Sequence, residues 1–327
     1  MTGRHIRILA AVAVALVGLV FVLDIADDSD EPAAGALLLP AFASAADGLS
    51  AIKVKGSGDE AAVTLGKQDQ KWVVSNLHNY PADLGKLRAL VLALAEARVM
   101  EEKTANPDFY HRLGVADPDA GGSGTRITLE GEGMRQAVIL GKVVQGNYRY
   151  ARLADADRSV LIDRNPEVPG DPSDWLDSLL VDVPADKVKR VTITHADGEK
   201  IVIEKESETQ GDFRVLDLPE GRVLAYATVA NAIGGTLANL RLDSVRPAVA
   251  GEAATTIVFA TFEGGTITVT AYPAADDAET TWFAFKAEPD LSGLNARTAG
   301  WEYRLPSFKK NQLTRRWEDL LKKTDSE

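Results

Sequence analysis

The chain has 327 residues, of which 45% are hydrophobic and 26% are charged, and this length can bury the cores of one large or two ordinary domains. Its 48 acidic residues against 36 basic ones give a net charge of −12, and so acidic a surface repels phosphate backbones, which argues against nucleic-acid binding. The sequence contains no cysteine, which excludes disulfides, thiolate metal sites and cysteine nucleophiles.

The N-terminal segment 1–25 predicts a membrane anchor. Arg4 and Arg7 precede an uninterrupted apolar run over 8–23, and acidic residues follow it. Such flanks predict an N-terminus in the cytoplasm and the rest of the chain across the membrane. We therefore expect a single-pass protein of the cytoplasmic membrane with its bulk on the periplasmic, extracytoplasmic side, followed by a linker over 26–47. Because the run is short for a spanning helix, a cleavable signal peptide stays the alternative.

The folded body that follows contains an internal repeat. Pairs of apolar residues two positions apart, the period of a strand with one buried face, recur in the same order in both halves at offsets of about 140 residues. The pairs are Ile52/Val54, Val63/Leu65 and Trp72/Val74 in the first half and Val191/Ile193, Ile201/Ile203 and Phe213/Val215 in the second. Trp175 and Trp317 lie in similar short segments at the end of each half. We expect a tandem duplication, with the first repeat over 48–183 and the second over 184–327.

A helical pattern follows the third strand of each half. Its apolar residues are Leu87, Leu90, Val91 and Leu94 in the first half and Ile233, Leu237 and Leu240 in the second. Strands in meander order with helices packed on one face predict an α+β fold. The expected architecture is therefore two tandem repeat domains of antiparallel strands with packed helices, preceded by a single N-terminal transmembrane helix.

The segment KWVVSNLHNYPAD, residues 71–83, places a histidine, a tyrosine and an aspartate in one turn and so resembles a site. Pro81 cannot continue a strand ladder, and Asp83 is well placed to cap the helix that follows. The matching corner of the second half lacks these polar residues. We therefore interpret the segment as a structural corner.

No histidine, glycine or serine motif identifies an active site. His78 and His111 flank the first long helix, and no histidine pair has metal-ligand spacing. His195 falls at a hairpin end and is expected to face solvent. The glycine-rich stretch over 121–125 leads into a strand, whereas a phosphate loop needs its amides at the start of a helix. We therefore assign no catalytic, cofactor-binding or metal residue, and we expect no cofactor.

Carboxylate pairs in loops leave a hydrolase open as an alternative. The pairs are Asp155/Asp157, Asp171/Asp174 and Asp276/Asp277. A glycosidase needs two acids held at a fixed separation by the scaffold, and loop acids are more often solvated surface groups. Asp117-Pro118-Asp119 resembles a fragment of a calcium loop but lacks the later ligands.

The C-terminal segment reverses the local charge of this acidic chain. The basic residues are Lys309, Lys310, Arg315, Arg316, Lys322 and Lys323. A solvated helix face is the favoured interpretation, and a contact with anionic lipid or an acidic partner is the alternative.

Besides the N-terminal anchor, several short stretches are distinctive. They are Leu37-Leu38-Leu39-Pro40, Lys71-Trp72-Val73-Val74, Tyr80-Pro81-Ala82-Asp83, Asp108-Phe109-Tyr110-His111-Arg112-Leu113-Gly114, Leu140-Gly141-Lys142, Tyr148-Arg149-Tyr150 and Asp174-Trp175-Leu176. Together they resemble the domain-of-unknown-function family 4340 over most of 35–321. The second half departs from this pattern, since it has no Tyr-Pro-Ala-Asp.

The resemblance implies an extracytoplasmic accessory protein near a gliding-type ABC transporter. Its expected partners are ABC transporter subunits or other envelope proteins, with the cytoplasmic membrane contacted through the N-terminal helix. The family carries no established catalytic residues, so none is transferred. We expect a membrane-anchored, non-catalytic binding protein, and the alternative is an envelope hydrolase that uses loop carboxylates or a cryptic metal site.

Overall fold

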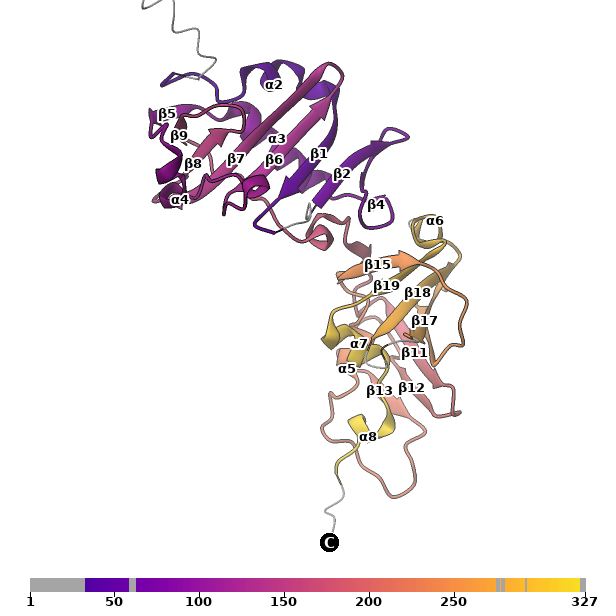
Figure 1. Ribbon diagram of the computed structural model, residues 1–327. Helices are drawn as coiled ribbons and strands as arrows, with labels where there is room; N and C mark the ends of the chain where they lie inside the picture. The colour runs from indigo at the N-terminus through magenta and orange to yellow at the C-terminus, as the bar shows by residue number, and fades with distance from the viewer. Residues whose placement is uncertain (1–32, 59–62, 275–276, 278–279, 292, 324–327) are drawn as a thin grey trace, which may run out of the picture. The chain divides into compact units, whose positions relative to one another are not determined.

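The computed structural model describes residues 33–323 apart from 59–62, 275–276, 278–279 and 292 (Figure 1). The chain divides into two units: unit 1 comprises Met1–Ala61 with Leu90–Glu167, and unit 2 comprises Ala62–Ala89 with Val168–Glu327. The predicted division into repeats at residues 183 and 184 is a different one and stays a prediction.

An antiparallel sheet forms the body of unit 1. Its strands are β1 (Leu49–Lys55), β5 (Val99–Glu102), β6 (Thr125–Gly131), β7 (Met134–Val144), β8 (Tyr148–Leu153) and β9 (Ser159–Ile162). They lie in the order β1-β6-β7-β8-β9-β5. Alternation along β1 buries Ile52 and Val54, which pair with Leu129 and Ile127 of β6. The paired apolar side chains share one face and build the core of the sheet.

Few helices accompany this sheet. They are α2 (Pro40–Ala45), α4 (Tyr110–Leu113) and the three-residue helices η1 (Ala46–Gly48), η2 (Pro107–Phe109) and η3 (Pro118–Ala120). The helix α3 (Leu84–Glu96) begins in unit 2 and continues into unit 1. Asp83 caps it as predicted, because its Oδ1 atom accepts hydrogen bonds from the backbone nitrogens of Gly85 at 2.8 Å and Lys86 at 3.1 Å.

Unit 2 is built around an eight-stranded antiparallel sheet with the order β13-β12-β11-β16-β17-β18-β19-β15. Its strands are β11 (Val188–His195), β12 (Lys200–Glu204), β13 (Arg214–Leu216), β15 (Ser244–Pro247), β16 (Thr255–Thr261), β17 (Thr266–Pro273), β18 (Thr281–Glu288) and β19 (Trp301–Arg304). A separate pair is formed by β10 (Leu179–Val181) and β14 (Leu240–Arg241). The unit also contains β2 (Val63–Gln68), β3 (Lys71–Val74) and β4 (Tyr80–Pro81), in the order β4-β3-β2.

The helices of unit 2 are short. They are η4 (Pro172–Trp175), α5 (Asn231–Gly234), α6 (Leu294–Thr298), α7 (Ser307–Leu313) and α8 (Trp317–Leu320). The core of the large sheet is formed by buried side chains of β11, β16, β17 and β18, such as Ile193, Phe259, Val269 and Phe283.

The strand order of the first half recurs in the second. The series β1-β6-β7-β8-β9-β5 corresponds strand for strand to β11-β16-β17-β18-β19-β15, and β3-β2 corresponds to β13-β12. The irregularity at the start of the corresponding strands β1 and β11 also recurs, between Leu49 and Ala51 in β1 and between Val188 and Arg190 in β11. A repeated bulge requires the same register as well as the same order.

The predicted α+β class is wrong. The described residues form mostly antiparallel sheets, two of them large, with few helices. The helical pattern of the second half yields only α5, because Gly234 and Gly235 interrupt it and glycine costs about 1 kcal/mol relative to alanine in a helix interior. The repeats therefore consist mainly of sheet, and α3 has no long counterpart in the second half.

The predicted single-pass membrane protein is also not supported. In the part of the chain that the structure describes, no helix is both long and apolar enough to cross a bilayer. The longest, α3, has 13 residues, which at about 1.5 Å per residue falls well short of a hydrocarbon core of about 30 Å. The segment 1–25, which was expected to supply the spanning helix, lies outside the described residues.

Candidate functional site

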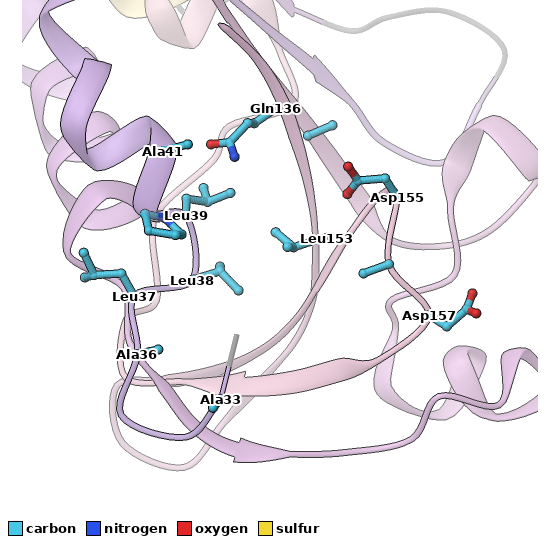
Figure 2. Close-up of a pocket in the computed structure, with 13 residues that line it drawn as sticks. Ala33, Ala36, Leu37, Leu38, Leu39, Ala41, Gln136, Leu153, Asp155 and Asp157 are labelled. Carbon is cyan, nitrogen blue, oxygen red and sulfur yellow. The ribbon is translucent and has the colours of Figure 1, made fainter. Parts of the chain in front are cut away.

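The main candidate site is a cavity of about 770 Å³ in unit 1, called here the unit 1 cavity (Figure 2). It is lined by Ala33, Ala36, Leu37, Leu38, Leu39, Pro40, Ala41, Gln136, Ala137, Leu153, Asp155, Ala156 and Asp157. These residues come from the segment that leads into α2, from the start of β7, from the end of β8 and from the loop that follows β8. Most of the side chains are small and apolar.

One wall of the cavity is held by the backbone beside β5. The nitrogen of Gly35 donates to the carbonyl of Val99 at 2.7 Å, and the nitrogen of Leu38 donates to that of Ala97 at 2.8 Å. Leu38 is fully buried, so this wall is anchored in the core of unit 1. The nitrogen of Phe42 in α2 donates to the Oε1 atom of Gln136 at 3.0 Å, which joins α2 to the start of β7.

The opposite wall is the short loop 154–158 between β8 and β9. The hydroxyl of Tyr110 donates to the carbonyl of Asp157, and a guanidinium nitrogen of Arg152 donates to the carbonyl of Ala156 at 2.8 Å. The Arg152 guanidinium also lies 4.5 Å from the centre of the Tyr110 ring. These contacts fix the backbone of the loop and leave its two carboxylates at the rim.

The polar groups of the unit 1 cavity are few and acidic. Asp155 and Asp157 are both exposed, and among the described residues no Lys or Arg forms an ion pair with either. In Figure 2 the two carboxylates point in different directions, and Gln136 lies on another wall. The cavity therefore offers an apolar surface with an anionic rim, which favours binding of a group that is partly apolar and partly cationic.

A second, smaller pocket of about 350 Å³ lies in unit 2 beside the corner at 71–83. The ring of Tyr80 meets that of Trp301 edge to face at 5.2 Å and lies 6.1 Å from that of Tyr303. Burial raises the pKa of both tyrosines, so both phenols stay protonated at neutral pH. Burial, and then the charge of Asp83, raise the pKa of the Asp177 carboxyl at the same pocket.

The segment 71–83 forms a structural corner, and the second half contains a matching corner. The nitrogen of Asp83 donates to the carbonyl of Trp175 at 2.7 Å, and the nitrogen of Asp177 donates to that of Pro81 at 2.9 Å. In the second half, the pair Leu224 and Leu321 forms the matching bridge. The polar residues of the stretch 79–83 thus lie in a turn that occurs in both halves of the chain.

The histidines do not assemble into a site. His78 and His111 are exposed and belong to different units. The expectation that His195 faces solvent is wrong, because its ring is buried, with Nδ1 3.0 Å from the hydroxyl of Thr255 and Nε2 2.9 Å from the carbonyl of Arg315. Both ring nitrogens are therefore used inside the fold. In the described part of the chain, no group of three or more His, Asp or Glu side chains is placed to hold a metal ion.

The other carboxylate pairs shape local turns. Asp171 accepts a hydrogen bond from the nitrogen of Ser173 at 2.8 Å and caps η4. Asp277 accepts from the hydroxyl of Thr280 at 2.7 Å, while its predicted companion Asp276 lies outside the described residues. The stretch that resembles a calcium loop is a capped turn, in which Asp117 pairs with Arg126.

The C-terminal basic residues are only partly a solvated face. Lys309 is buried, and its Nζ atom donates to the carbonyls of Thr236 at 2.6 Å and Ala238 at 3.1 Å. Arg316 pairs with Asp197 at 2.7 Å and with Glu199 at 2.9 Å. These two side chains join segments that are far apart in the sequence, which charge clustering alone did not indicate.

Sequence reasoning named Asp155 and Asp157 and the stretch Leu37-Leu38-Leu39-Pro40, but it did not indicate that they line one cavity. The lining comes from three stretches that are distant in the sequence, so no local motif marks it. The lengths of two corresponding connections could have indicated the uncovered surface, because β8 and β9 are joined by 154–158 whereas β18 and β19 are joined by the longer segment 289–300.

Comparison with known proteins identifies the family. The family model described as Domain of unknown function (DUF4340) matches residues 72–257, which is more than half of the chain. No curated protein and no solved structure matches the chain. The predicted membership of family 4340 is thereby confirmed, and the chain belongs to the DUF4340 family.

Proposed function

We propose that the chain is a non-catalytic accessory protein that binds a segment of another protein in the unit 1 cavity. The lining of this cavity carries the proposal. It combines leucine and alanine side chains with one amide and two carboxylates, and it contains no histidine, lysine, serine or tyrosine to act as nucleophile or base. Such a surface provides area and charge for recognition.

The resemblance to family 4340 suggests the kind of partner. It implies a subunit of an ABC-type transport system or another envelope protein, and this part of the proposal rests on the resemblance alone. The acidic rim adds a chemical requirement, since Asp155 and Asp157 favour a partner segment that carries a lysine or arginine.

A hydrolase that uses loop carboxylates is the second candidate. The observation in its favour is that Asp155 and Asp157 line the same cavity. The observation against it is their orientation, because the two carboxylates do not converge on one point of the cavity (Figure 2).

Affinity capture with the tagged full chain tests the proposed function. The chain would be recovered from its own host after mild cross-linking, and the co-purifying proteins would be quantified. We expect a transporter subunit to be recovered with the unaltered chain and with Ala120→Trp, which adds bulk at an exposed position outside the cavity, and to be lost with Ala41→Trp, which fills the cavity. Recovery of the chain alone would contradict the proposal, and so would a hydrolytic activity that Asp155→Asn abolishes.

A further inference from the structure

The second half of the chain carries a helix that the first half lacks. Strands β18 and β19 are joined by residues 289–300, which include α6. The corresponding strands β8 and β9 are joined by 154–158 alone, without a helix. The two halves otherwise share their strand order, so this connection is a specific difference between them.

In unit 2, α6 is fastened to two elements through backbone groups. The side chain of Asn295 bonds both backbone groups of Ala287 at the end of β18, accepting from its nitrogen and donating to its carbonyl, each at 2.8 Å. Arg297 donates to the carbonyl of Leu180 in β10 at 3.0 Å. Leu294 and Thr298, four positions apart on one face of the helix, are buried.

The anchoring point at Leu180 has a counterpart in unit 1. Leu179 pairs with Arg241 in the same way as Leu37 pairs with Arg98. Leu180, the residue after Leu179, therefore corresponds to Leu38.

The anchoring point at the end of β18 is matched through the paired strands. Ile257 pairs with Val269 as Ile127 pairs with Val138, and Val269 pairs with Phe285 as Val138 pairs with Leu153. Leu153 is therefore the counterpart of Phe285, whose carbonyl accepts a hydrogen bond from Thr298 of α6 at 3.1 Å, and Asp155 is the counterpart of Ala287. Both Leu38 and Leu153 line the unit 1 cavity. The cavity therefore corresponds to the surface that α6 covers in the second half, and the connection between β8 and β9 supplies no such helix in the first half.

We propose that the unit 1 cavity binds a short helix of a protein partner on the surface that corresponds to the one α6 covers in unit 2. This inference rests on the proposed function and names the partner's chemistry. The helix presents a leucine to the apolar lining and an arginine or lysine to Asp155 and Asp157 at the rim. Charge complementarity selects this occupant, since among the described residues no Lys or Arg forms an ion pair with either carboxylate.

The charge of the chain itself argues against its own N-terminal segment as the occupant. The sequence between the apolar run and Ala33 contains Asp24, Asp27, Asp28, Asp30 and Glu31 and no basic residue. Such a segment would bring like charges to the rim, which is unfavourable.

A peptide titration tests the inference directly. The chain has no cysteine, so Ala36→Cys places a single environment-sensitive fluorophore at the cavity, and Ala120→Cys gives a control label away from it. The probe is a helix-stapled peptide with the sequence of residues 290–300, and its partner probe has the arginine replaced by glutamate. We expect a saturable signal from the Ala36 label only, and binding of the arginine peptide about tenfold tighter than that of the glutamate peptide, because an exposed ion pair at the rim is exchanged for repulsion.

Variants of the two rim carboxylates and of Ala41 distinguish specific binding in the cavity from other causes of the signal. Asp155→Lys together with Asp157→Lys should reverse the preference between the two peptides, and Ala41→Trp should abolish binding of both while the melting curve stays cooperative. Equal affinity for the two peptides, binding that survives Ala41→Trp, or a label signal that follows protein concentration without peptide, as a second copy would produce, would each overturn the inference. If affinity capture recovers a partner but no peptide binds, the proposed function stands and the helix inference fails. If the peptide binds as expected but no partner is captured, the proposed function fails instead.

Discussion

Gly234 shows how the packing around one residue influences the secondary structure of a segment. It is buried in α5, and a methyl group placed on it would approach the ring of Phe213 to 2.1 Å. Its neighbour Gly235 has more room, with the nearest atom at 3.4 Å from such a methyl group. The contact with Phe213 therefore requires glycine at position 234 but not at position 235.

This difference predicts opposite outcomes for two neighbouring substitutions. Gly234→Ala should lower the free energy of unfolding by about 1–3 kcal/mol, because the added methyl overpacks a buried site. Gly235→Ala should leave it unchanged or raise it slightly, since alanine restricts the unfolded chain. Urea unfolding of both variants checks this, and equal stabilities would show that the Phe213 ring does not close over Gly234.

Asp177 gives a prediction for pH. Burial and the charge of Asp83 raise the pKa of its carboxyl in the folded state, so the native protein holds this proton more tightly than the unfolded chain does. The contribution of Asp177 to stability is therefore fully present below its unfolded pKa and is lost as pH rises through its folded pKa. Asp177→Asn removes that loss.

Asp177→Asn should thus be more stable than the unaltered chain at pH 7, by less than about 1 kcal/mol because Asp177 is exposed and solvent screens its charge, and no more stable at pH 3. Thermal melts at the two pH values measure the difference. Asp174→Asn, at an exposed position of the same segment, is the control. A stability gain that is the same at both pH values would exclude titration of Asp177 as its cause.

At the scale of elements, the missing helix between β8 and β9 can be supplied. Replacing residues 154–158 with the sequence of 289–300 should place a helix over the unit 1 cavity and abolish peptide binding. The leucine of the graft that corresponds to Leu294 should then be buried, and burial of a leucine side chain is worth about 1.5–3 kcal/mol.

A matched pair of grafts isolates that leucine. A second graft with serine at the same position has the same length and the same lost contacts, so their difference in unfolding free energy reports burial of the leucine alone. Equal stability of the two grafts would mean that the added helix does not lie on the cavity.

The elements also show what the sequence could predict and why it failed elsewhere. The period-two pairs such as Ile52/Val54 and Val191/Ile193 lie in strands, because alternation is a local property that burial on one face imposes directly. The helical pattern after the third strand was misleading in the second half, where the glycine pair Gly234-Gly235 and the contact of Gly234 with Phe213 override it. Tertiary packing determined the structure of this segment, and a local sequence pattern carries no information about such packing.

The site shows the same limit. Asp155 and Asp157 could be named from the sequence, but their position at one cavity with Leu38, Ala41 and Gln136 follows from the sheet order. The buried roles of His195 and Lys309 likewise depend on partners about 60 to 120 positions away in the sequence. Side chains that were expected to face solvent hold the fold together instead.

At the scale of the whole molecule, the recurring strand order relates the fold to the candidate site. One strand order is used twice, and the second copy covers with α6 the surface that the first copy leaves as a cavity. The net charge of −12 adds to the acidic rim, so association with a basic partner segment should weaken as salt is added. The chain thus offers one covered and one uncovered version of the same surface.

Hydrogen exchange of the full chain, with and without the peptide of residues 290–300, tests this most directly. We predict slower exchange in the segments 36–41, 136–137 and 153–157 when the peptide is present, and unchanged exchange around α6, where the corresponding surface is already covered. Protection that is absent from these three segments, or that is centred on α6, would contradict the assignment of the unit 1 cavity as the uncovered counterpart.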